Sequence, residues 1–256
     1  MLNNQNILFR KKETILKSFT LFVIGFLFLG RAINGIEEPY ATGDGPEYVL
    51  TTEAIYNHFT PDLRGEDSKT FKTAYTKILD WTKNYKYETF DALEGFLANN
   101  NVNFLDQQGG IYVDKNKKKY GYHFFAYAAV NVPARWVCDL VGANPLMCFQ
   151  VTNAFLIIIT CFFLLFYSPF SLPKTILTAL IFTFSSAYWH LGWTHPEVYT
   201  ICLVTLAFWF YFQERLLLGI LLLSLASFQN QPLVIVLAFM ALRAVIVGGF
   251  KLKNLF

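Results

Sequence analysis

Two carboxylates, Asp44 and Glu47, lie three residues apart in the turn Gly43–Tyr48, directly after the first hydrophobic segment. A carboxylate within hydrogen-bond reach of a hydroxyl can remove its proton as that oxygen attacks an electrophilic carbon. A simpler hypothesis is a solvated turn in which Asp44 caps a helix that begins near Pro46. The pattern is therefore typical of a general base or of a helix N-cap, and both hypotheses stand.

Three further candidate residues are His123, His195 and Glu197. His123 stands in the aromatic run Tyr120–Phe125, so it is also expected in the aromatic belt of a membrane interface. The sequence from His195 to Glu197 is also expected at a helix start, with a proline in the first turn and an acid matched to the helix dipole. Each residue alone is therefore a weak indication of a site.

Two features supply positive charge, namely Arg135 and the basic run Lys115–Lys119. The lysine run is typical of a solvated loop, or of contact with anionic lipid headgroups. Neither feature by itself indicates a functional site.

The composition indicates where these residues lie. Of the 256 residues 54% are hydrophobic and only 15% are charged, whereas soluble domains carry about 25% charged residues. The four cysteines have no metal-ligand spacing and lie mostly in apolar sequence, which favours dispersed thiols over a disulfide framework. The chain is therefore expected to be an integral membrane protein with one sizeable polar region.

Apolar runs predict an all-α polytopic membrane protein with about six transmembrane helices. The first run, Phe19–Leu29, reaches the roughly 20 residues of a span when its flanks are counted. A cleaved signal peptide is the alternative, although the small-residue cleavage pattern is poor. The later spans are predicted at 145–167, 174–189, 198–212, 216–228 and 233–248.

A long polar loop separates the first span from the others. Its predicted helices are 53–57, 70–85 and 89–99, and residues 106–120 are turn-rich. Residues 123–141 are apolar but contain Arg135, Asp139 and a proline, which are costly at the centre of a lipid-facing helix. A second span is the alternative, but we expect a helix that lies in the interface or packs against the bundle. This gives three regions in all: 1–35, 36–144 and 145–256.

Basic residues predict the orientation of the chain. In this scheme each short inner turn carries lysine or arginine and neither short outer turn does, as the positive-inside rule requires. The inner basic residues are Lys174, Arg215, Lys251 and Lys253, after a basic N-terminal tail, and the outer turns are 190–197 and 229–232. The N-terminus is then cytoplasmic. The candidate residues before position 144 and those near 195 share the extracytoplasmic face.

Three short motifs together resemble one superfamily. They are the acidic stretch Gly43–Leu50, the aromatic stretch Tyr122–Tyr127 and the turn Trp193–Glu197, in a layout of a first span, a long outer loop and later spans. This arrangement resembles the GT-C superfamily of membrane glycosyltransferases. It is most similar to uncharacterised bacterial members and, more distantly, to protein mannosyltransferase-like and aminoarabinose transferase-like proteins.

The resemblance implies a reaction. A sugar would move from a polyprenyl-phosphate donor to a glycan, lipid or protein acceptor outside the bacterial inner membrane, with inversion and without nucleic acid. It implies Asp44 as the base, with Glu47 as a second candidate. Donor-phosphate contacts are expected from His123, His195, Glu197 and Arg135. A divalent cation, if used, is expected at Asp44 and Glu47, although two carboxylates do not complete an oxygen cage.

Two alternatives remain at the level of the sequence. One is a non-catalytic lipid-binding or assembly subunit on the same scaffold, or a truncated, inactive fragment of such an enzyme. The fragment is considered because superfamily members usually have more spans than six. The other is a transporter, which is expected to carry internal repeats and polar groups near the bilayer midplane. No repeat is evident, and Arg243 is the main charge within the later spans.

Overall fold

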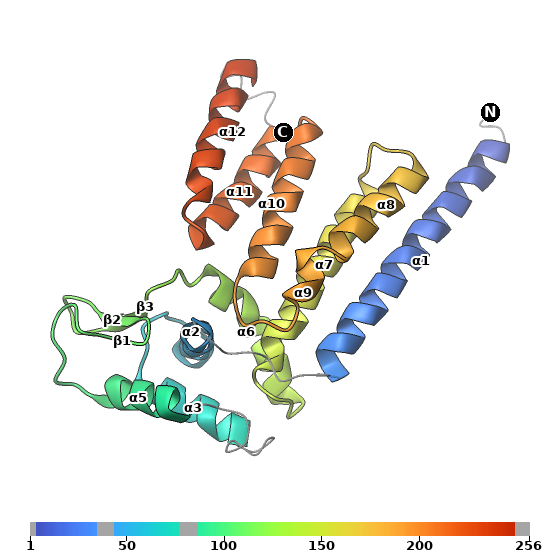
Figure 1. Cartoon of the computed structure of the whole chain (residues 1–256). Helices are drawn as coiled ribbons and strands as arrows, with labels where there is room; N and C mark the ends of the chain where they lie inside the picture. The colour runs from blue at the N-terminus through green and yellow to red at the C-terminus, as the bar shows by residue number, and fades with distance from the viewer. Residues whose placement is uncertain (1–3, 35–43, 77–86, 249–256) are drawn as a thin grey trace. The chain divides into compact units, whose positions relative to one another are not determined.

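The computed structural model describes residues 4–34, 44–76 and 87–248, and it divides into two compact units (Figure 1). The apolar unit comprises Met1–Arg31, Asn153–Leu191 and Glu197–Phe256. The polar unit comprises Ala32–Thr152 together with the short segment Gly192–Pro196. The prediction of an all-α chain is confirmed for the described residues, with one small sheet added.

The helices of the apolar unit follow the predicted apolar runs. Helices α10, α11 and α12 lie side by side at the C-terminal end of the chain (Figure 1). A Cβ at Gly219 of α11 would lie 2.8 Å from the carbonyl oxygen of Ala207 in α10, so the glycine allows these backbones to approach closely. The helices are α1 (Asn4–Asn34), most of α7 (Met147–Phe166), α8 (Leu172–Thr183), α9 (Ser186–Trp189), α10 (Glu197–Phe212), α11 (Leu216–Gln229) and α12 (Leu233–Gly248).

Two described helices are long and apolar enough to cross a membrane, Arg10–Asn34 and Met147–Phe166. The apolar helices Glu197–Phe212, Leu216–Gln229 and Leu233–Ile246 are shorter than the roughly 20 residues that a full span needs. Their helical state is confirmed, but the lengths alone support two spans, and the six-span layout stays a prediction.

Large apolar side chains cover the outside of the last helix. They recur at the spacing of one helix face, and a soluble protein would bury most of such a continuous stripe. The exposed residues on α12 are Val234, Ile235, Phe239, Leu242, Val245 and Ile246. This face is therefore suited to contact with lipid.

The predicted span 174–189 is not one continuous helix, and this expectation was wrong. Helix α8 ends at Thr183, and the four-residue α9 begins at Ser186. The Ser185 hydroxyl donates a hydrogen bond to the Phe182 carbonyl (2.6 Å) and accepts one from Ala187 N–H. A serine that satisfies its neighbours' backbone in this way ends one helix and caps the next.

The polar unit is built around α2 (Gly45–His58), which packs against α3 (Gly65–Thr76) and α6 (Ala126–Leu140). Helix α5 (Tyr87–Ala98) packs against α3. The predicted helix 53–57 is thus the last part of a longer helix. Part of the predicted helix 70–85 lies outside the described residues.

A three-stranded antiparallel sheet replaces the predicted turn-rich segment. Its strands are β1 (Gln107–Gln108), β2 (Ile111–Val113) and β3 (Lys119–Gly121), with Ile111 opposite Gly121. Gly109 and Gly110 form the first turn with φ of +54° and +83°, values that glycine adopts without steric cost. A two-residue Gly-Gly connection is a known hairpin signal, so this sheet was within reach of sequence reasoning.

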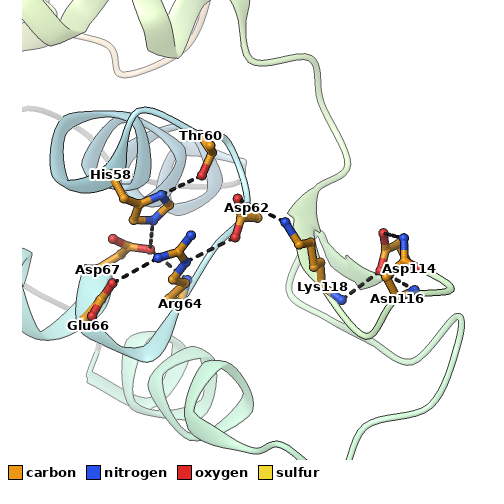
Figure 2. A network of polar contacts seen from close by, with 9 residues as sticks. All are labelled: His58, Thr60, Asp62, Arg64, Glu66, Asp67, Asp114, Asn116 and Lys118. Carbon is orange, nitrogen blue, oxygen red and sulfur yellow. Dashed lines mark hydrogen bonds and ion pairs between the residues drawn. The ribbon is translucent and has the colours of Figure 1, made fainter.

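A polar network ties the end of α2 to the start of α3 (Figure 2). The buried Asp67 carboxylate accepts a hydrogen bond from the Arg64 backbone N–H (2.7 Å) and from the Asn57 amide (2.8 Å). His58 Nε2 lies 3.3 Å from the same carboxylate, and His58 Nδ1 lies 2.7 Å from the Thr60 hydroxyl. All these partners lie within about ten residues of one another, so the network stabilises a local corner.

Candidate functional site

Asp44 immediately precedes α2, where the sequence predicted either a cap or a base. Its carbonyl oxygen accepts hydrogen bonds from the N–H groups of Glu47 (3.1 Å) and Tyr48 (3.4 Å). Its side chain makes no capping hydrogen bond and is 56% exposed. Asp44 therefore occupies the N-cap position through its backbone alone, and the capping hypothesis does not account for its carboxylate.

Glu47, one turn into α2, is buried, with 2% of its side chain exposed. Both carboxylate oxygens face the same residue. Oε1 accepts a hydrogen bond from the His123 backbone N–H, and Oε2 lies 3.0 Å from His123 Nδ1. A buried carboxylate that contacts the backbone N–H and a ring nitrogen of one residue holds both the backbone and the ring of that residue in place.

The opposite edge of the His123 ring faces Asp44. His123 Nε2 lies 3.7 Å from Asp44 Oδ2, and 34% of the His123 side chain is exposed. That separation exceeds hydrogen-bond distance but is short enough for electrostatic attraction. Glu47, His123 and Asp44 thus form a series of three titratable groups that begins in the protein interior and ends at its surface.

Burial raises the pKa of Glu47 above its ordinary 4.5, while the hydrogen bonds and charge of His123 oppose that rise. The nearby Asp44 carboxylate adds to the increase. The ionised form of Glu47 therefore depends on His123, since an unpaired buried carboxylate is strongly disfavoured.

Aromatic rings bring a second histidine to this cluster. The Tyr48 ring lies 5.6 Å from the His123 ring and 6.0 Å from the His195 ring, centroid to centroid. The Trp193 ring lies 5.7 Å from His195, and the exposed Tyr122 ring lies 5.5 Å from His123. The segment Gly192–Pro196 belongs to the polar unit, so two of its side chains join those at the start of α2.

The other two predicted site residues are Arg135 and Glu197. The Arg135 guanidinium is buried and donates two hydrogen bonds to Glu53, from Nε to Oε1 and from Nη2 to Oε2 (3.2 Å). Burial raises the pKa of Glu53, and the hydrogen bonds and charge of Arg135 oppose that rise. Glu197 starts α10 in the apolar unit, and its Oε2 is buried without a hydrogen-bond partner among the described residues. The structure thus accounts for Arg135 as an internal ion pair between α2 and α6.

Within the described residues, no group of three or more His, Cys, Asp and Glu side chains is arranged to hold a metal ion. Asp44 and Glu47 were the candidate ligands for a divalent cation. Glu47 directs both oxygens at nitrogen atoms of His123, and oxygen-seeking cations need about six ligands. These two residues therefore do not fit a cation site on their own.

The sequence did not single out two glycines that border the cluster. A Cβ at Gly110 would lie 2.7 Å from Glu47 Oε2, and a Cβ at Gly121 would lie 2.7 Å from Glu47 Oε1. The sheet brings these glycines close to each other, because Tyr122 N–H donates to the Gly110 carbonyl (2.7 Å). The Gly-Gly hairpin signal would have placed Gly110 in a turn, but no sequence signal linked it to Glu47.

Comparisons of this chain with protein-family models, with curated proteins and with solved structures found no significant match.

Proposed function

We propose that this chain is a GT-C-type membrane glycosyltransferase that transfers a sugar from a polyprenyl-phosphate donor to an acceptor hydroxyl on the extracytoplasmic side. One observation carries the proposal. The exposed carboxylate of Asp44, which has no capping role, lies beside the His123 imidazole that buried Glu47 holds in place. A base beside a fixed proton donor is what displacement of a lipid phosphate by a hydroxyl requires.

The proposed reaction is a single inverting displacement. Asp44 accepts the proton of the acceptor hydroxyl while that oxygen forms a bond to the anomeric carbon. The bond between that carbon and the phosphate oxygen breaks, and its electron pair leaves with the lipid phosphate. The imidazoles of His123 and His195, which flank Tyr48, supply N–H groups to the departing phosphate.

The surrounding aromatic residues support a ligand with apolar faces and polar edges. Tyr122 and Trp193 both expose part of their rings beside the two histidines. Binding sites for small molecules commonly combine aromatic walls with a few placed polar groups. A sugar ring on a lipid phosphate fits that combination.

The membrane setting has independent support within each unit. Two described helices, Arg10–Asn34 and Met147–Phe166, are of sufficient length, and the apolar unit has the lipid-suited face of α12. In the polar unit, α6 exposes Trp136, Val137 and Leu140 on one side, and Trp136 lies against the exposed Phe59 with ring centroids 6.3 Å apart. An amphipathic helix with such a face is typical of the membrane interface, as expected for residues 123–141.

The substitution Asp44→Asn tests the proposal. Transfer of labelled sugar from a polyprenyl-phosphate donor, measured with purified protein in detergent, should fall by roughly 10²–10⁴-fold, the usual contribution of a general base. The matched control is Glu66→Gln, which changes another exposed carboxylate of the polar unit and should leave transfer unchanged. Transfer that survives Asp44→Asn would remove Asp44 from the mechanism.

The same assay separates the enzyme from a non-catalytic lipid-binding or assembly subunit. Such a subunit would bind the polyprenyl-phosphate sugar and yet transfer none of it, with the wild-type chain as well as with Asp44→Asn. Binding without transfer in wild type would therefore replace the enzymatic proposal with this second one.

A further inference from the structure

We infer that Glu47 is a positioning residue for His123, and that the Nε2 edge of His123 is the group that contacts the anionic phosphate of a lipid-linked donor. The positioning rests on geometry alone, whereas the phosphate contact rests on the proposed function. Glu47 was the second candidate for the general base, and its geometry argues for a different role.

The first argument is the position of the Glu47 carboxylate. Its side chain is almost fully buried, and both of its oxygens are directed at His123. A general base must reach the proton that it removes. Glu47 has no exposed oxygen with which to do so, whereas Asp44 has.

The second argument is the close fit around that carboxylate. Gly110 and Gly121 each leave room where a Cβ would lie 2.7 Å from a Glu47 oxygen. Contacts of a Cβ below 3.0 Å essentially never occur, so an alanine at Gly121 would displace the carboxylate or the strand. The φ angle of Gly121 is not positive, so its backbone conformation does not require a glycine. The lack of a Cβ at this position instead allows Glu47 to approach β3.

Glu47 also determines which ring nitrogen of His123 carries the proton in the neutral state. Because Glu47 Oε2 lies 3.0 Å from His123 Nδ1, ionised Glu47 accepts a hydrogen bond from Nδ1–H. Nδ1 then keeps its proton in both charge states of the ring. Any proton that His123 gains or donates is consequently at Nε2, on the edge that faces Asp44.

With this arrangement, every proton that is given up in the proposed displacement has an acceptor. Cationic His123 donates its Nε2 proton to the phosphate oxygen as the carbon–oxygen bond breaks, and Asp44 takes the proton of the acceptor hydroxyl. The proton then passes from Asp44 to His123 Nε2, which lies 3.7 Å away in the resting protein. Both groups return to their starting states, and the net change is one glycosyl transfer.

Nitrogen NMR of the full chain in detergent micelles, with ¹⁵N-labelled histidine, tests the positioning. The chain has four histidines, so His123→Gln identifies the resonances of His123 by their loss. Neutral His123 should be protonated at Nδ1 in wild type. In Glu47→Gln and Gly121→Ala the fraction protonated at Nε2 should rise. Gly95→Ala is the matched control, because a Cβ at Gly95 of α5 meets no atom within 4 Å.

A second measurement with the same sample tests the phosphate contact. A short-chain polyprenyl phosphate should shift the Nε2 resonance of His123 and leave that of His58 in place, since both ring nitrogens of His58 have partners inside the protein. In the transfer assay Glu47→Gln should lower kcat by at least about tenfold with a smaller change in KM, as expected when a group acts mainly in the transition state.

Each failure has its own meaning. Wild-type His123 protonated at Nε2, or an unchanged tautomer in Glu47→Gln, would overturn the positioning even if Asp44-dependent transfer is found. The expected tautomer without any sugar transfer would leave the positioning intact and contradict the proposed function. A polyprenyl phosphate that shifts no His123 resonance would overturn the phosphate contact.

Discussion

His58 and His123 each lie beside a buried carboxylate in the polar unit, and the two residues differ in what the second ring nitrogen meets. In the His58–Asp67 pair, Nε2 faces the carboxylate at 3.3 Å and Nδ1 lies 2.7 Å from the Thr60 hydroxyl. In the His123–Glu47 pair, Nδ1 faces the carboxylate, and Nε2 faces the exposed Asp44 at 3.7 Å. The first ring is 12% exposed and the second 34%.

This difference shows that a buried carboxylate beside a histidine does not by itself identify a functional site. Both ring nitrogens of His58 have partners within the same corner of the chain, so the pair joins two helices (Figure 2). His123 has one anchored and one outward-facing nitrogen, which is the arrangement that proton transfer to a ligand needs. The distinction depends on the second nitrogen, and that can be seen only in three dimensions.

The largest effect on stability is expected at Asp67. Asp67→Asn replaces a buried acceptor oxygen with an amide group, which leaves at least one of the three nitrogens that contact the carboxylate unpaired. Loss of such a charged, buried acceptor costs about 3 kcal/mol, which lowers the Tm by roughly 6–12 °C for a chain of this size. Thermal unfolding in detergent, followed by tryptophan fluorescence, measures the change.

Asp44→Asn is the matched control for that substitution, because the Asp44 side chain is exposed and makes no capping bond. Its effect on the free energy of unfolding should stay within about 0.5 kcal/mol. Equal losses at the two positions would mean that the cluster around His123 is structural, like that around His58.

A smaller effect, which depends on pH, is expected at Glu47. Burial raises its pKa above 4.5. An acid with a raised pKa in the folded state contributes stability below its unfolded pKa, and the contribution is lost as pH rises through the folded pKa. The unfolding free energy of wild type minus that of Glu47→Gln should therefore be constant below about pH 4.5 and fall above it.

Chemical denaturation of both proteins across the acid range measures that difference. Glu53, whose pKa burial also raises, is present in both proteins and cancels. A difference that increases with pH would mean that the hydrogen bonds from His123 outweigh burial, and that the pKa of Glu47 is lowered in the folded protein.

The smallest effect is expected at the outer edge of the His58 network. Lys118 Nζ lies 3.9 Å from Asp62 Oδ1, and the lysine side chain is exposed (Figure 2). Exposed ion pairs contribute about 0–1 kcal/mol, so Lys118→Ala should change the unfolding free energy by less than that. A larger loss would show that the hairpin depends on this pair, and that the network is not confined to its local corner.

Most helices could be predicted from the sequence. The expected ranges 233–248 and 198–212 agree with α12 and α10 to within one residue at either end, because long apolar runs between polar turns have few alternatives to a helix. The break at Ser185 and the small sheet were missed. In both places a local effect outweighs the average hydrophobicity of the segment. At Ser185 it is hydrogen bonding of the side chain to the backbone, and in the sheet it is the Gly-Gly turn.

The candidate site was predictable only in part. Asp44, Glu47, His123 and His195 were selected from their types and setting, and the structure places all four in one unit. Their separate roles were not predictable, because Glu47 and His123 lie 76 residues apart and the burial of each depends on what packs over it. For the same reason, the partner of Arg135 was missed.

The sequence by itself determined the helical, apolar character of most of the chain and the kinds of chemistry that it can offer, since both follow from residue type and local spacing. Only the tertiary structure decided which carboxylate is buried and which is exposed. A short hairpin with glycines at Gly110 and Gly121 lets β3 approach α2, so that Glu47 is enclosed with His123 while Asp44 stays exposed. Burial and partnership are properties of packing, and they give two carboxylates one turn apart different environments, on which their proposed roles rest.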